Sequence, residues 1–225
     1  KTAMELALAG SKEEKRKLAK VIFEAAYERN IYPWSINDLY LARGRGEFGG
    51  FTVPAINLRT LTYDLARAIF RAAKRINAGA FIFEIAKSEM GYTEQIPIEY
   101  TSMCLAAAIK EGFSGPVFVQ GDHFQLKAKN YKENGGKEVE GMKMVMREAV
   151  MAGFFNIDID SSTLVDLSKA TIKEQQLDNY KVCGELTNFI REIQPAGVDI
   201  SVGGEIGEVG GKNSTPEELG AFMQG

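Results

Sequence analysis

From Phe51 onward, short apolar runs alternate with longer segments in which apolar residues recur at helical spacing. Such alternation is typical of parallel βαβ units, in which a helix connects each strand to the next. The runs are apolar almost throughout, as expected for strands that are covered on both faces. The predicted strands are residues 51–57, 80–85, 116–119, 154–160 and 198–202, and the predicted helices are residues 62–76, 98–111, 141–152 and 171–193, with another beginning at 216.

Five βα units leave two α/β architectures open. A closed (β/α)8 barrel usually needs about 250 residues and eight units. An open, doubly wound sheet can end after five strands. In either case we expect residues 1–225 to form a single domain in which residues 51–225 supply the five units.

The first 50 residues precede this pattern. Ser11 and Glu14 fit a capping box, and Leu18 and Ile22 follow at helical spacing, which predicts a helix. Residues 31–50 are aromatic and rich in turn-forming residues, and we interpret them as a turn-rich lead-in to the first strand.

Composition excludes several classes of function. The chain has 27 Lys and Arg against 30 Asp and Glu, so it lacks the basic excess typical of nucleic-acid or anionic-membrane binding. No apolar run approaches the roughly 18 residues that a membrane span needs. Cys104 and Cys183 lie in apolar helical patterns, so we predict reduced cysteines and a cytoplasmic protein. The single histidine, His123, excludes a metal site built from two or three histidines of this sequence.

Two further patterns are assigned no catalytic role. Residues 44–49 match the letters of a dinucleotide-binding G-x-G-x-x-G, but they precede a strand instead of following one, which predicts a turn. Residues 127–140 are rich in Lys and Glu around Gly135 and Gly136, and they are interpreted as a solvated insertion.

Polar residues gather where the predicted strands end. In barrels and open α/β sheets alike, catalytic and binding residues lie at the carboxyl ends of the strands. We therefore expect these residues to lie together along that edge of the sheet, which we call the rim. Each of them alone could be structural, and their shared position favours a functional site. The residues are Asn57, Ser88 (a few residues beyond its strand), Asp122, His123, Asp160 with Ser162, and Glu205.

Four of these segments resemble, in the same order, motifs of the class II, metal-dependent fructose-bisphosphate aldolases. The resemblance covers about residues 51–211. The matching segments are VPAIN at 53–57 (family P-A-F-N), QGDH at 120–123 (H-x-D-H), IDSS at 159–162 (I-D-x-S), and GEIG at 204–207 with Gly210-Gly211 (E-L-G-x-x-G-G).

The resemblance implies a (β/α)8 barrel and a reaction. The family cleaves fructose 1,6-bisphosphate into dihydroxyacetone phosphate and glyceraldehyde 3-phosphate, a step of glycolysis and gluconeogenesis. It implies Zn²⁺ as cofactor, with a second divalent or monovalent cation as an option, and a homodimer or homotetramer. A zinc ion with an open coordination position can stabilise the negative charge that develops beside a carbonyl.

The resemblance also implies roles for single residues. Asp122 resembles the acid/base that exchanges a proton with the C4 oxygen of the substrate, and His123 resembles a zinc ligand. Asp160 and Glu205 resemble the acidic pair near the metal. Asn57 resembles a substrate-contacting amide, and Ser88 is placed with it as a substrate-binding residue. Neighbours in an extended strand point to opposite sides, so Asp122 and His123 can share a site only if the strand end turns, which Gly121 would ease.

The chain departs from the family pattern at several positions. Gln120 stands where the third-strand motif has its first histidine, and Phe124 stands where a glycine usually follows. The acidic pair expected after Gly-Gly is replaced by Lys212 and Asn213, which leaves Glu208 or a residue outside this chain to accept the second proton. Two further family histidines and the phosphate-binding loops are also missing, and the sequence starts at Lys1 and ends inside a helix, so we expect a truncated chain.

Three alternatives stay open. The substrate could be tagatose 1,6-bisphosphate, the chain could be a non-catalytic aldolase-like subunit that supports a partner, or it could be a sugar-phosphate-binding barrel with a degenerate site.

Overall fold

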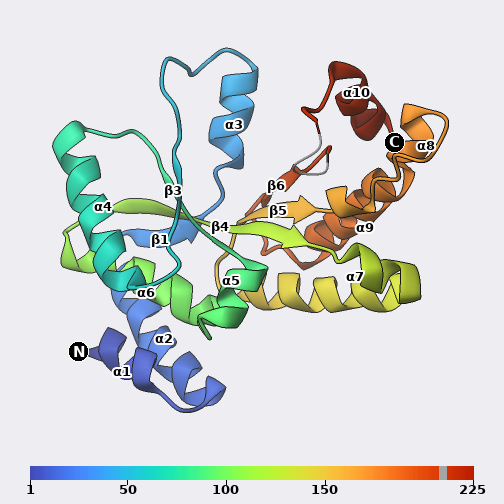
Figure 1. The fold of residues 1–225 in the computed structure, drawn as a ribbon. Coiled ribbons are helices and arrows are strands. Elements are labelled where there is room, and N and C mark those ends of the chain that lie inside the picture. The colour runs from blue at the N-terminus through green and yellow to red at the C-terminus, as the bar shows by residue number, and fades with distance from the viewer. Residues whose placement is uncertain (208–211) are drawn as a thin grey trace.

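A computed structural model describes residues 1–207 and 212–225, and its centre is a parallel sheet (Figure 1). Strands β2 to β6 are neighbours in sequence order, and β1 pairs with β4. A doubly wound sheet reverses its strand order at a switch point, whereas from β2 to β6 this sheet adds each strand beside the previous one. The chain therefore has a parallel α/β fold of the TIM-barrel type. The strands are β1 (Ile31–Trp34), β2 (Ala55–Asn57), β3 (Ile82–Ala86), β4 (Gly115–Gln125), β5 (Asn156–Asp160) and β6 (Ser201–Gly204).

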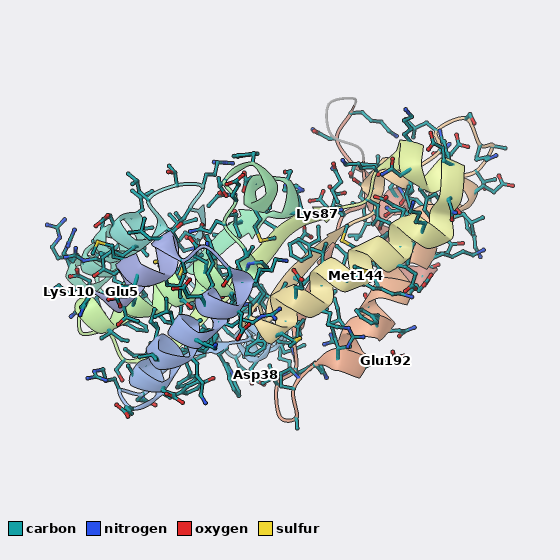
Figure 2. The ribbon with its side chains drawn as sticks, turned by 90° about the horizontal axis from the view of Figure 1, so that it is seen from below. Glu5, Asp38, Lys87, Lys110, Met144 and Glu192 are labelled. Carbon is teal, nitrogen blue, oxygen red and sulfur yellow. The ribbon has the colours of Figure 1, made fainter. Side chains whose placement is uncertain are left out.

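Helices connect the strands and cover the sheet. In Figure 1, α6 and α7 lie below the sheet and α3 rises above it; Figure 2 shows the molecule from the helical side, with Met144 on α7 and Glu192 on α9. The core between sheet and helices contains Phe70, Phe83 and Tyr100, all fully buried. The helices are α1 (Thr2–Leu8), α2 (Lys12–Tyr27), α3 (Asn37–Gly44), α4 (Thr62–Ile76), α5 (Lys87–Tyr92), α6 (Pro97–Lys110), α7 (Ala128–Met151), α8 (Ile172–Gln175), α9 (Leu177–Ile193) and α10 (Pro216–Gln224), with a 3₁₀ turn at Ser162–Leu164.

The interpretation of residues 31–50 as a turn-rich lead-in is wrong for much of its length, because β1 and α3 lie within it. Pro33 weakens the strand pattern, but β1 pairs only with β4 among the described strands, and such an edge position tolerates proline. Asn156, at the start of β5, holds the end of β1 in place. Its buried side chain accepts a hydrogen bond from the N–H of Ile36 (2.8 Å) and donates one to the carbonyl of Val119 (3.0 Å).

Two other predictions are corrected. The insertion at 127–140 is helical and forms the first half of α7, whose one non-helical residue is Asn134 (φ −158°, ψ 87°), directly before Gly135 and Gly136. The third predicted strand, 116–119, extends to Gln125. Its length was underestimated because its carboxyl-terminal half is polar. Among the other predicted elements, α4 begins and ends as predicted, and residues 44–49 form the end of α3 and a turn.

Candidate active site

The structure places the six predicted site residues at or just beyond the carboxyl ends of the strands. Four of them meet at the ends of β4, β5 and β6, where the imidazole of His123 lies within 4 Å of the other three. The positions are the last residue of β2 (Asn57), α5 directly after β3 (Ser88), the end of β4 (Asp122 and His123), the last residue of β5 (Asp160) and the residue after β6 (Glu205).

The imidazole of His123 lies among three of the predicted carboxylates. Its Nδ1 is 3.4 Å from Asp160 Oδ2 and 3.4 Å from Glu205 Oε1. Its Nε2 is 3.8 Å from Asp122 Oδ1. The ring is 46% exposed, so it sits at the surface of the cluster and is accessible to a ligand.

An irregularity in β4 lets adjacent residues share this site. The pairing of β4 with β5 shifts register between Gly121 and Phe124, and His123 has φ 43°, in the left-handed region. The carboxylate of Asp158 on β5 accepts the His123 N–H at 3.3 Å and so stabilises this backbone conformation. The strand end does turn, and Asp122 and His123 therefore face the same cluster.

Gly121 has a different role from the one expected. Its φ is not positive; instead, a Cβ there would lie 2.5 Å from Cζ of the fully buried Phe124 ring. Glycine is needed at this position because the ring packs directly against its α-carbon.

Gly121→Ala is accordingly expected to lower the free energy of unfolding by about 1–3 kcal/mol through overpacking. The measurement is urea denaturation. Gly184→Ala is a matched control, since Gly184 is exposed in α9 with no atom within 4 Å of the added Cβ, and it should be neutral or stabilising by up to about 1 kcal/mol. Equal stability of Gly121→Ala and wild type would contradict the packing argument.

Asp160 is held by hydrogen bonds on both of its oxygens. Oδ1 accepts from the N–H (3.2 Å) and the hydroxyl (2.7 Å) of Ser162, and Oδ2 accepts from the amide of Gln125 (2.6 Å). The residue is 2% exposed. Asp160 therefore joins the ends of β4 and β5.

The loop that carries Glu205 is anchored by buried amides of α9 and the residue before it. The Asn179 side chain donates to the Glu205 carbonyl (2.8 Å), and Gln176 donates to that of Ile206 (2.6 Å). Asn179 in turn accepts from the Ser161 hydroxyl at the end of β5 (2.6 Å). This network fixes the end of β6 relative to the end of β5.

Glu84 and Asp158 are carboxylates of this region that the sequence analysis missed, because both lie inside apolar strand segments. Asp158 is two residues before Asp160, and this spacing, which places both on one face of a strand, is the signal that could have found it. Glu84 Oε2 accepts a hydrogen bond from the Gln120 amide (3.1 Å). Burial, with the nearby Asp122 charge, raises the pKa of Glu84 from 4.5 to about 7.

The electrostatics of the cluster follow from its crowded carboxylates. Burial, followed by the charge of Glu205, raises the pKa of Asp158 to about 6. Burial also raises the pKa of Asp122, and His123 offsets only part of this effect. For His123, burial lowers the pKa, but the charge of Asp122 and of the other carboxylates outweighs it, so that the pKa lies above its ordinary value. The site thus has an excess of negative charge that a cation would neutralise.

The raised pKa of Glu84 predicts a pH dependence of stability. The folded protein holds this proton more tightly than the unfolded chain, so the stabilisation is fully present below about pH 4.5 and is lost as the pH rises through about 7. Glu84→Gln should therefore melt at a higher temperature than wild type at about pH 8 and at a similar temperature at about pH 4.5, with a chelator present in both. The exposed Glu13→Gln is the control; a melting difference that is independent of pH would contradict the expectation.

Asn57 is oriented by Glu89, a third carboxylate that the sequence analysis missed. Glu89 Oε2 accepts from the Asn57 amide (2.7 Å) and from the Ala86 N–H (2.8 Å), and Oε1 accepts from Arg59 (2.5 Å). Asn57 Oδ1 is buried and has no hydrogen-bond partner among the residues that the structure describes. Its carbonyl oxygen is therefore an acceptor without a protein donor.

A cleft of about 610 Å³ opens beside the cluster, lined by Asp122, His123 and Ser88 on one part of its wall. Three cationic residues, Arg59, Lys87 and Lys127, line it as well. Lys87, labelled in Figure 2 at the start of α5, lies with its Nζ 3.5 Å from the Gln125 carbonyl, and burial lowers its pKa. The cleft thus combines acidic groups with cations that can bind an anion.

The donor set fits a divalent cation. Within residues 1–207 and 212–225, one set of three metal-ligating side chains, Asp122, His123 and Asp158, brings ligand atoms within 4.8 Å of one another. One imidazole nitrogen with carboxylate oxygens is a donor set that suits zinc and similar divalent ions.

Part of the predicted fifth-strand loop, Glu208 and Gly210-Gly211, lies outside the described residues. Lys212, which replaces an expected acidic residue, pairs with Glu218 at the start of α10 (2.8 Å).

The fold and the rim define a barrel-type parallel α/β protein with an acidic, imidazole-containing cleft at the carboxyl ends of its strands. The model of the class II fructose-bisphosphate aldolase family matches residues 45–223. Because this match spans most of the chain, the protein belongs to that family.

A solved structure described as a "probable tagatose 6 phosphate kinase" from Sinorhizobium meliloti 1021 is similar with a TM-score of 0.54 and 16% identity. The similar region covers 77% of this chain and 43% of that one, and at this identity it supports the fold alone. The search of curated proteins gave no significant match.

No helix in the part of the chain that the structure describes is long and apolar enough to cross a membrane.

Proposed function

We propose that the protein catalyses the cation-dependent aldol cleavage of a ketose 1,6-bisphosphate and the reverse condensation. The proposed substrate is fructose 1,6-bisphosphate, cleaved to dihydroxyacetone phosphate and glyceraldehyde 3-phosphate in glycolysis or gluconeogenesis. Family membership supports the reaction class. The observation that carries the proposal is the turn in β4, which sets Asp122 beside His123 in the wall of the cleft.

Asp122 is the proposed acid/base. As the bond between C3 and C4 breaks, Asp122 accepts the proton of the C4 hydroxyl, whose oxygen becomes the aldehyde oxygen, and the electron pair of the bond passes to C3 and the adjacent carbonyl. A second acid, for which the family resemblance leaves Glu208 or a residue outside this chain, then gives C3 the proton that completes dihydroxyacetone phosphate. In condensation, Asp122 returns its proton. The raised pKa of Asp122, which arises from burial, favours this exchange because it brings the carboxyl nearer to neutral pH.

His123 would hold the cation, with Glu205 and a carboxylate of β5, for which the family pattern indicates Asp160. When bound, zinc or a similar ion supplies Lewis-acid stabilisation of the negative charge that develops beside the carbonyl. The excess of carboxylates around His123 supports such a site, and a second cation is proposed as an option.

Substrate binding is proposed for the remaining groups of the cleft. Arg59, Lys87 and Lys127 carry the charge to bind a phosphate, and the exposed Ser88 can add a hydroxyl donor. Asn57 Oδ1, which accepts no hydrogen bond from the described residues, is suited to accept one from a sugar hydroxyl.

The free, buried Cys104 and Cys183 support the further proposal of a cytoplasmic protein. We also propose a homodimer or homotetramer on the basis of family membership.

A non-catalytic, aldolase-like subunit is the second candidate. The contact between Lys212 and Glu218 supports it, because the family places an acidic residue where this lysine stands. Such a subunit would bind a sugar phosphate without cleaving it.

An aldol-cleavage assay tests both candidates. Purified protein is stripped with a chelator, reconstituted with Zn²⁺, and offered fructose and tagatose 1,6-bisphosphates, while both three-carbon products and substrate binding are measured. Zinc-dependent release of both products from the fructose substrate is the expected result. Cleavage of the tagatose substrate alone would change the assigned substrate. Binding without cleavage would favour the non-catalytic subunit, and neither binding nor cleavage would overturn both candidates.

A further inference from the structure

We propose that Asp158, and not Asp160, supplies the β5 carboxylate of the cation site. This inference rests on the proposed cation-dependent function and departs from the pattern that the family motif indicates. It is carried by the register of β4, β5 and β6 and by the hydrogen bonds of the two aspartates.

The register of the sheet places Asp158 beside the turn in β4. Gly121 and Phe124 pair with Ile157 and Ile159, so the two residues of the irregularity, Asp122 and His123, lie opposite Asp158. Asp160 pairs with Gln125, one residue beyond the pair of Phe124 and Ile159. Alternate residues of a strand are about 6–7 Å apart, so the two aspartates lie at different levels of the site.

The hydrogen bonds distinguish the two carboxylates. Both oxygens of Asp160 are engaged by Ser162 and Gln125. Asp158 Oδ2 accepts only the N–H of His123, and Oδ1 accepts no hydrogen bond from the described residues. A cation can therefore be bound by Asp158 without first displacing a protein donor.

Gly203 makes room for the Asp158 side chain. It is the register partner of Asp158 on β6, and a Cβ at this position would lie 3.1 Å from Asp158 Oδ1. The free oxygen therefore faces a position without a side chain. Together with Asp122 and His123, Asp158 forms the set whose ligand atoms lie within 4.8 Å of one another.

Cation affinity of matched variants tests the inference. Zn²⁺ binding is measured by calorimetry, and the absorption spectrum of bound Co²⁺ reports on the ligands. Asp158→Asn retains an oxygen that can accept the His123 N–H, so its loss of affinity would reflect the lost charge and ligand. We expect at least about tenfold weaker binding for Asp158→Asn. Asp160→Asn should bind within a few-fold of wild type but melt at a lower temperature, because it disturbs the hydrogen bonds to Gln125 and Ser162.

Gly203→Ala is the second variant, should Asp158→Asn fail to fold. Its Cβ would lie 3.1 Å from Asp158 Oδ1 and push this oxygen aside by a few tenths of an ångström while every carboxylate is kept, so a smaller loss of cation affinity is expected. The inference is overturned if Asp158→Asn binds as wild type does, or if Asp160→Asn alone loses affinity. If the wild-type protein binds no cation, the inference and the proposed function are overturned together. If the wild type binds a cation and neither Asp158→Asn nor Gly203→Ala changes its affinity, the inference alone is overturned.

Discussion

Asp122→Asn is expected to lower the turnover number about 10²–10⁴-fold, the usual contribution of a general acid or base. The amide has the size of the carboxylate and can still form a hydrogen bond to the C4 oxygen, but it cannot accept the proton. Affinity for the substrate should therefore change far less than turnover. Turnover, substrate affinity and melting temperature are measured on the same preparation.

The control for this variant is Asp199→Asn, which makes the same chemical change at an exposed position that pairs with Arg191, away from the cleft. It should leave turnover unchanged. Weaker binding with normal turnover would assign Asp122 a role in ground-state binding. A lower melting temperature with neither kinetic change would make Asp122 a structural residue, and either result would remove it from the proposed mechanism.

His123→Ala is expected to weaken Zn²⁺ binding by about 100-fold or more and to abolish cation-dependent cleavage, while the protein stays folded. The imidazole is the one nitrogen donor in the described three-residue set, whereas the core lies in the apolar strands and helices. Calorimetry with Zn²⁺ and a thermal melt measure the two effects. Wild-type affinity in this variant would show that the imidazole is structural.

The backbone at this position provides an internal control. With φ 43°, alanine is strained there as histidine is, but glycine is not. His123→Gly should therefore melt at a higher temperature than His123→Ala while binding zinc equally weakly. Weak binding in both variants, despite different stabilities, would separate loss of the ligand from damage to the fold.

Local patterns predicted much of the fold. The apolar periodicity of residues 62–76 gave the bounds of α4, and the alternation of strands and helices gave the parallel sheet. β1 was missed because its stability comes from pairing with β4, far along the chain, and not from its own residues. The length of β4 was missed because its carboxyl end is polar where it enters the cleft.

The candidate site was predicted only in part, because some of its features also depend on contacts between strands. The rule that chemistry lies at strand ends identified Asp122, His123 and Glu205, which do meet. It did not identify Asp158, which lies inside a strand and whose spacing from Asp160 was the available signal. The oxygens that hydrogen bonds leave free could not be predicted, because they depend on the register between strands. The turn at His123 is also a property of the β4–β5 pair, which no single segment encodes.

The pairing of β1 with β4 has a consequence for the order in which the protein folds. Contacts between successive strands β2 to β5 span fewer residues than those of β1: Asn57 and Glu89 are 32 residues apart, and His123 and Asp158 are 35 apart. Each new strand can therefore dock on the previous one as it emerges. The contacts that fix β1 span 84 residues, from Asn30 to Ser114, and 120 residues, from Ile36 to Asn156. Long-range contacts of this kind slow folding, so we expect β1 to dock late, after β2 to β5 have paired.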